Sequence, residues 1–233
     1  MDNAAEAQDL ELDSFAPALD QDTRPLQVAE IRTYPSNWIL SWSNVRRYQE
    51  APDDTMVPLE FAFHLLGDVT AKTIVDLGCG DGLNTAILAM FGAKVIAVDG
   101  SENNLALTAA RIQANGVAGN VTLVRANGVR IPVADASADR VLCTTAFDQP
   151  DFLGVARQIR RVLKPGGAAT FLQERTVSRD QMEKISRAVG SPGRHREFTF
   201  VARMLSRLGV QRNLNMWMPR RFTSFVWEAR KEA

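Results

Sequence analysis

Two carboxylates flank a glycine-rich bend in the first half of the chain. Asp76 lies in the apolar run 73–77, directly before Gly78-Cys79-Gly80-Asp81-Gly82, and Asp99 closes the next apolar run, 94–98. Glycines at a bend let the backbone turn sharply and let a ligand approach without a Cβ in the way. Asp99 can accept hydrogen bonds from both hydroxyls of a ribose, and Asp76 can attract a cationic amino group, directly or through water. The predicted ligand therefore has a ribose and an ammonium group and no phosphates.

The glycine spacing argues against a dinucleotide. A dinucleotide site requires G-x-G-x-x-G and places a pyrophosphate at the helix N-terminus. Counted from Gly78, the third glycine would fall on Leu83, whereas here it falls on Gly82. Asp76 would repel a pyrophosphate, and no arginine adjoins Asp99 to hold a 2′-phosphate. A nicotinamide-dependent oxidoreductase is therefore the less favoured alternative.

Strand-like and helix-like patterns alternate through the centre of the chain. This rhythm predicts an α/β protein with a Rossmann-like, seven-stranded, mostly parallel sheet, an antiparallel C-terminal strand and helices on both faces. Ligands bind at the carboxyl ends of the strands of such sheets. The expected strands are 73–77, 94–98, 121–125, 140–144, 168–173, 210–217 and 222–230, and the expected helices are 83–91, 103–115, 153–163, 180–189 and 198–208.

The stretch from about residue 55 to 175 resembles the class I S-adenosylmethionine-dependent methyltransferases, particularly those that act on small molecules. The resemblance is carried by the glycine bend with its acid, by Asp99 and by the turn Leu163-Lys164-Pro165-Gly166-Gly167. It implies S-adenosyl-L-methionine as the cofactor, with the glycine bend at its methionine end and Asp99 at its ribose. The cofactor-binding residues that it implies are Asp76, Gly78, Cys79, Gly80, Gly82, Asp99, Gly100, Asn127, Gly128 and Thr144.

Three of these positions depart from the family pattern. Asn127 stands where the family often has an acid that accepts the adenine amino group, so this hydrogen bond loses its charge assistance. Gly100 and Gly128 provide no side chain around the adenine. The resemblance therefore implies a thinner adenine site and weaker cofactor binding, unless Val129 or a tryptophan of a lid fills the gap.

The sequence identifies no catalytic base. A methyl group on a sulfonium is strongly electrophilic, so alignment with the acceptor can supply most of the rate. A base is useful when the acceptor is a hydroxyl and is unnecessary for a thiol, amine or carboxylate that already carries a lone pair. Asp148, in the expected acceptor region 144–149, is a candidate base or substrate ligand, or else only a solvated or helix-capping acid. The run 148–152 does not match methyltransferases of base or glutamine amino groups.

Two histidines and an aromatic N-terminal segment are weaker candidates. His64 is expected to be structural, and His195 is expected in a solvated loop that could contact substrate. Helices are expected from Ser36 to about Glu50 and from Thr55 to Leu66, within a helical lid formed by residues 25–70. Alternatively, the aromatic residues of the first of these helices, Tyr34, Trp38, Trp42 and Tyr48, simply pack it on the domain.

Composition narrows the remaining possibilities. Lys+Arg and Asp+Glu number 27 each, so the chain has no global preference for nucleic acid or membranes. Cys79 and Cys143 form neither a disulfide framework nor a metal motif, and the start of the chain does not read as a signal peptide.

We expect a cytoplasmic enzyme with a small-molecule substrate, no metal, an acidic disordered tail over residues 1–24 and a methyltransferase domain over 71–233. A non-catalytic cofactor-binding or scaffold protein, and a nucleic-acid methyltransferase, remain alternatives.

Overall fold

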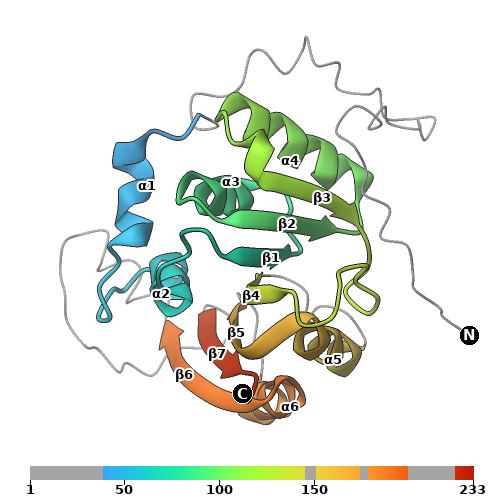
Figure 1. Cartoon of the computed structure of the whole chain (residues 1–233). Helices are drawn as coiled ribbons and strands as arrows, with labels where there is room; N and C mark the ends of the chain where they lie inside the picture. Colours follow the sequence, from blue (N-terminus) through green and yellow to red (C-terminus); the bar gives the residue numbers. More distant parts are fainter. Residues whose placement is uncertain (1–38, 145–150, 174–177, 199–223) are drawn as a thin grey trace, which may run out of the picture.

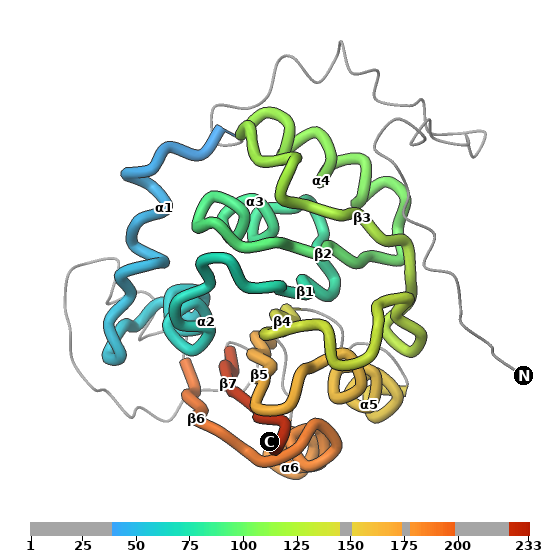
Figure 2. Tube along the Cα trace, viewed as in Figure 1, coloured from blue at the N-terminus to red at the C-terminus, as the bar shows by residue number. Residues whose placement is uncertain are grey.

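The computed structural model describes residues 39–144, 151–173, 178–198 and 224–233 (Figures 1 and 2). One sheet of seven strands forms its centre, in the order β3-β2-β1-β4-β5-β7-β6. Strands β1 to β5 are parallel, and β7 is antiparallel to both of its neighbours. The predicted fold class is thereby confirmed. The strands are β1 (Thr73–Leu77), β2 (Lys94–Asp99), β3 (Val121–Arg125), β4 (Ala138–Cys143), β5 (Leu163–Gln173), β6 (Ser191–Phe198) and β7 (Ser224–Arg230).

Three of the described helices begin at residues whose side chains satisfy free N–H groups. The side chains of Ser101 and Asp151 accept hydrogen bonds from backbone amides of the first turns of α4 and α5. Ser178 forms a capping box with Gln181 at the start of α6. The helices are α1 (Trp42–Gln49), α2 (Pro58–Leu66), α3 (Leu83–Met90), α4 (Glu102–Ala114), α5 (Phe152–Val162) and α6 (Arg179–Val189), with a 3₁₀ turn, η2 (Ala118–Asn120).

Strand β1 and residues 168–173 of β5 bury both of their faces, which explains their continuous apolar runs. Successive residues of a strand point to opposite faces. Val75 accordingly belongs to a core cluster with α5 and α6, while Ile74 belongs to a second cluster with α1, α2, α3 and α4. A third cluster joins α2 to the β5, β6 and β7 side of the sheet. Figure 1 shows α5 and α6 on one side of the sheet and α3 on the other.

The N-terminal helices begin later than the sequence predicts. Helix α1 starts at Trp42, with Ser41 at its N-cap, rather than after Ser36. Helix α2 starts at Pro58, because the Thr55 hydroxyl donates to the Glu60 carboxylate 2.6 Å away and accepts a hydrogen bond from the Val57 amide instead of capping the helix. The expected tail, residues 1–24, lies outside the described residues.

The sixth strand is the main error of the sequence interpretation. Residues 191–198 form edge strand β6, which pairs with β7, so His195 lies on a strand and not in a loop. Strand β6 is exposed along most of its length and contains a proline, a glycine and a register shift, so no apolar alternation marks it. Phe198 ends this strand and does not begin a helix. The rest of the expected helix 198–208, and the expected strand 210–217, lie outside the described residues.

The expected turn 164–167 falls within the bounds of β5. It is nevertheless visible as a break in register, since Leu163 pairs with Ala138 and Ala168 pairs with Arg140. Five residues of β5 thus pass opposite two of β4, and Gly166 takes a positive φ of 74°. Strand β5 therefore begins immediately where α5 ends.

We predict that Trp227→Ala destabilises the fold by about 3–5 kcal/mol. Trp227 lies on β7, stacks on Phe171 with ring centroids 4.9 Å apart and is 1% exposed, so truncation leaves a cavity in the larger core cluster. Trp42 is a matched control because it is 49% exposed and touches Phe91 edge-on, so Trp42→Ala should cost only about 1 kcal/mol. Urea unfolding measures both values, and equal losses for the two variants would contradict the prediction.

Candidate functional site

The glycine bend follows β1 and is anchored to the end of β2. The amides of Gly78 and Cys79 both donate to the carbonyl of Val98, at 2.8 and 3.1 Å. Gly78, Gly80 and Gly82 all have positive φ values, 77°, 58° and 77°. A Cβ on Gly82 would lie 2.8 Å from the Thr108 backbone, whereas a Cβ on Gly80 would meet nothing within 4 Å. Close packing on α4 therefore requires a glycine at 82, and Gly80 borders open space.

Two residues of α4 brace the bend from behind. The Thr108 hydroxyl donates to the Gly80 carbonyl at 2.9 Å. Arg111 donates through Nε to the Asp81 carbonyl at 2.8 Å and through Nη2 to the Asp81 carboxylate at 2.6 Å, while its side chain is 5% exposed. The sequence interpretation missed both residues. Their spacing of three residues, on one face of the helix that follows Asp99, is the signal that could have revealed them.

Asp76 is a fully buried carboxylate with an unused acceptor. Thr85 donates to Oδ2 at 2.6 Å, and Oδ1 has no hydrogen-bond partner among the described residues. Burial raises the pKa of Asp76 from its ordinary value of 3.8 to about 6, against the opposing effect of the Thr85 hydrogen bond. An incompletely satisfied buried acid is costly, so its presence beside the bend points to a ligand that donates to it.

Asp99 connects the bend to the next loop of the sheet edge. Its Oδ2 accepts from the Gly80 amide at 3.0 Å, and its Oδ1 accepts from the Ser101 amide at 2.9 Å and from Asn104 Nδ2 at 3.2 Å. The carboxylate is thus oriented by N–H groups on both sides. It is half-buried at the carboxyl end of β2, so it can still accept further hydrogen bonds from a ligand.

The remaining predicted ligands lie at the same edge of the sheet. The Ala126 amide donates to the Asp99 carbonyl at 3.1 Å, which places the loop with Asn127 and Gly128 beside Gly100. Asn127 is exposed, and its Oδ1 accepts from the Arg130 amide at 3.1 Å. Thr144 directly follows β4 and is half-buried. The structure therefore brings all ten predicted residues to the carboxyl ends of β1 to β4.

Cys79 has a structural side chain. Its Sγ lies 3.6 Å from the Thr108 hydroxyl and is buried against α4. Burial raises the pKa of the thiol, and the nearby Asp76 carboxylate raises it further. Because the thiolate is the nucleophilic form, Cys79 is unsuited to attack a substrate.

The weaker candidates do not converge on the bend. His64 lies on α2, where its Nδ1 is 2.8 Å from the Ala51 carbonyl and its Nε2 is 3.3 Å from Asp53, as expected for a structural residue. His195 is exposed on β6. Asp148, Tyr34 and Trp38 lie outside the described residues.

Helix α1 packs at the amino ends of the strands. The Trp42 ring meets Phe91 edge-on with centroids 5.7 Å apart, and Phe91 follows α3, which runs away from the bend. The Leu40 amide donates at 2.7 Å to Asn115, at the far end of α4. These contacts favour the alternative that the aromatic side chains pack this helix on the domain. Trp42 therefore does not fill the gap left by Gly100 and Gly128.

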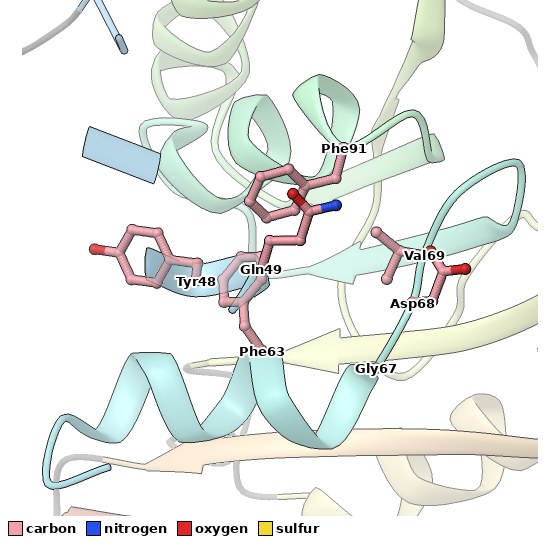
Figure 3. Close-up of a pocket in the computed structure, with 7 residues that line it drawn as sticks. All are labelled: Tyr48, Gln49, Phe63, Gly67, Asp68, Val69 and Phe91. Atoms are coloured by element: carbon pink, nitrogen blue, oxygen red, sulfur yellow. The ribbon is translucent and has the colours of Figure 1, made fainter. Parts of the chain in front are cut away.

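A cavity of about 150 Å³ lies at this opposite edge (Figure 3). It is formed by the end of α1, by α2, by the segment that leads into β1 and by the residue after α3. The cavity is not part of the candidate site, because the glycine bend lies at the other end of the strands. It is lined by Tyr48, Gln49, Phe63, Gly67, Asp68, Val69 and Phe91.

Two other kinds of functional feature are absent from the described ranges. In those ranges no cluster of three or more His, Cys, Asp or Glu side chains is arranged to hold a metal ion. None of the helices described combines the length and apolar character needed to cross a bilayer.

Part of this chain matches known proteins. Residues 74–167 match a family model described as a methyltransferase domain. A demethylmenaquinone methyltransferase of Lactococcus lactis is 34% identical over 112 residues, covering 46% of this chain and 44% of the relative. A ubiquinone biosynthesis O-methyltransferase of Pseudomonas paraeruginosa is 25% identical over 166 residues, covering 71% and 68%. The relatives also include a ribosomal RNA methyltransferase. The chain spans less than half the length of the first relatives it matches.

Solved structures share the fold. The structure of an S-adenosylmethionine-dependent methyltransferase from Mesorhizobium loti superposes with a TM-score of 0.57 at 20% sequence identity, covering 73% of this chain and 95% of that one. At this identity the likeness concerns the fold alone. The family model, however, spans every residue that the glycine bend, the two acids and Thr144 contribute. Residues 74–167 therefore match a methyltransferase domain, and the described fold is shared with solved S-adenosylmethionine-dependent methyltransferases.

Proposed function

We propose that this protein transfers the methyl group of S-adenosyl-L-methionine to a small-molecule acceptor. The observation that carries the proposal is the buried Asp76 carboxylate with its unpaired Oδ1, beside a bend that Asp99 closes on the other side. One acid suits an ammonium group and the other a ribose diol. The cofactor therefore matches the chemistry of the site as well as the methyltransferase domain model that residues 74–167 match.

The chain's own residues would bind and orient the cofactor. Gly80 offers a surface without a side chain, Asp76 would neutralise the amino group, and Asp99 would accept from the ribose. Seven further residues are proposed to bind the cofactor because they lie at the same carboxyl edge of the sheet. They are Gly78, Cys79, Gly82, Gly100, Asn127, Gly128 and Thr144. When bound, the cofactor supplies an electrophilic methyl group on its sulfonium.

The protein's contribution to rate would be alignment rather than acid–base chemistry. Among the described residues no side chain is positioned as an evident general base, and Asp148 lies outside them. Holding an acceptor in line with the methyl group removes most of the entropic barrier. An acceptor with an available lone pair, or an acidic hydroxyl, would react without further assistance.

The acceptor is proposed to be a small metabolite. Two of the relatives carry names from quinone biosynthesis, which favours a ring-bearing acceptor. The equal numbers of acidic and basic residues argue against a polyanion such as RNA. We further propose that residues 71–233 form the catalytic domain and that the protein acts in the cytoplasm. Lid roles for segments within residues 25–70 other than α1 are also part of this proposal.

We predict that the wild-type protein binds S-adenosylhomocysteine and does not bind NAD. Asp99→Ala should weaken S-adenosylhomocysteine binding about 10- to 100-fold, because two hydrogen bonds to a charged acceptor are lost. Isothermal titration calorimetry measures both ligands. Asp180→Ala is the control and should bind like wild type, since this acid is exposed on α6 and makes no contact with the bend. Wild-type protein that ignored millimolar S-adenosylhomocysteine would refute the proposed function.

We predict opposite pH effects of Asp76 on stability and on binding. Its pKa is near 6 in the folded state and near 3.8 in the unfolded chain, so the folded state holds more protons between these values. Stability should fall as the pH rises through this window, to a penalty of about 3 kcal/mol above it. Asp76→Asn removes the titration, so its unfolding free energy relative to wild type should rise by about that amount from pH 4 to pH 7.

Ligand binding should follow the reverse course. Wild-type affinity for S-adenosylhomocysteine should increase through pH 6 as Asp76 ionises, and Asp76→Asn should bind weakly at every pH. Asp180→Asn, an exposed acid on α6, is the control and should change neither profile. If the affinities of wild type and Asp76→Asn for S-adenosylhomocysteine changed in parallel with pH, the buried acid would not titrate near pH 6 and the prediction would be wrong.

We predict that the methyl group passes to a small molecule rather than to RNA. Methyl-labelled donor is incubated with the protein and with separate metabolite and total RNA fractions of a cell extract. Label should appear in the metabolite fraction, and Asp99→Ala should reduce it in proportion to the loss of cofactor affinity. Label found in RNA would instead align this protein with its ribosomal RNA relative.

A further inference from the structure

Two glycines border the end of the proposed cofactor site where the base would bind. The structure shows that these two positions differ in the room they leave for a side chain. Gly100 follows β2, and Gly128 lies in the loop after β3. These two strands pair in parallel, with Asp99 opposite Arg125, so both glycines lie at the same edge of the sheet. Any role of these glycines toward a base rests on the proposed function, because it requires that Asp99 hold the ribose.

The position of the base can be deduced from the surroundings of Asp99. Its Oδ2 faces the Gly80 amide on the glycine bend, and its Oδ1 faces the Ser101 amide on the opposite side. A nucleoside whose amino-acid half lies along the bend must direct its base to that opposite side. The segments there are the start of the loop at Gly100 and residues 126–128, which the Ala126 amide holds against the Asp99 carbonyl at 3.1 Å.

Packing favours glycine at position 128. A Cβ at this position would lie 3.1 Å from Cγ2 and 3.4 Å from Cγ1 of Val155, a fully buried residue of α5. Such a methyl group would require Val155 or the loop to shift by a few tenths of an ångström. Packing against the core therefore disfavours a side chain at 128.

Nothing in the structure requires a glycine at position 100. Its φ is not positive, and an added Cβ would meet only the Ala126 carbonyl oxygen, at the ordinary contact distance of 3.7 Å. The residue is also exposed. A Cβ at position 100 would therefore fit without strain, beside the place assigned to the base.

We propose that Gly100 determines the affinity of this site for its nucleoside. Without a side chain at this position, the base gains no apolar contact from the residue that follows β2. Cofactor and demethylated product are then held loosely and exchange rapidly. An apolar residue at position 100 would bury part of the base and retain both ligands longer.

The test is a graded series at this one position. Gly100→Ala, Gly100→Val and Gly100→Leu should bind S-adenosylhomocysteine progressively more tightly, with about a five- to tenfold lower Kd for leucine. Binding of 5′-methylthioadenosine, which keeps the base and lacks the amino acid, should tighten by the same factor. Calorimetry gives Kd, and the unfolding temperature of each free variant should match wild type.

Gly119→Leu is the matched control. Gly119 is likewise exposed, has no positive φ and has nothing within 4 Å of an added Cβ, but it lies at the opposite end of β3. The Kd of Gly119→Leu for S-adenosylhomocysteine should equal that of wild type. Wild-type binding with no gain across the Gly100 series, at unchanged unfolding temperature, would overturn this inference and leave the proposed function standing. Failure of the wild type to bind either ligand would overturn both.

Discussion

The hydrogen bond from the Gly80 amide to the Asp99 carboxylate is the contact on which the site depends. It joins the bend after β1 to the end of β2, so one charged group fixes two strand ends relative to each other. Helix α4 makes this arrangement rigid, because Thr108 and Arg111 hold the same bend from behind. A ribose acceptor and a surface for the amino acid are thereby positioned before any ligand arrives.

This arrangement also shows which glycines have room for a Cβ. Gly82 has none because the bend lies directly on Thr108, and Gly128 has little because of Val155. Gly80 and Gly100 have open space around an added Cβ, although the positive φ of Gly80 still favours glycine there. Four of the five glycines of the site thus divide into two packed against helices and two at the open edge, a distinction that sequence spacing does not contain.

Much of the fold was predictable because strands at the centre of its sheet are buried on both faces. The continuous apolar runs of β1, β2 and β3 and the intervening helical patterns indicate a parallel sheet, and the two acids mark its carboxyl edge. Strand β6 carries no such signal, since an exposed edge strand need not be apolar. The support from Thr108 and Arg111 was less evident, because their spacing shows only a shared helix face and the folded chain is needed to show that this face meets the bend. The position of α1 could not be read either, since an aromatic helix packs equally well at either edge.

Asp76 shows most directly how function limits stability in this protein. Its side chain is wholly buried, and one of its two oxygens remains without a partner among the described residues. Its pKa near 6 means that at neutral pH the folded protein retains a charge that burial disfavours. Thr85 offsets only part of this cost, and a second internal donor would have removed it. A cationic amino group of a bound ligand can supply the missing donor, so the structure is most complete when its ligand is present.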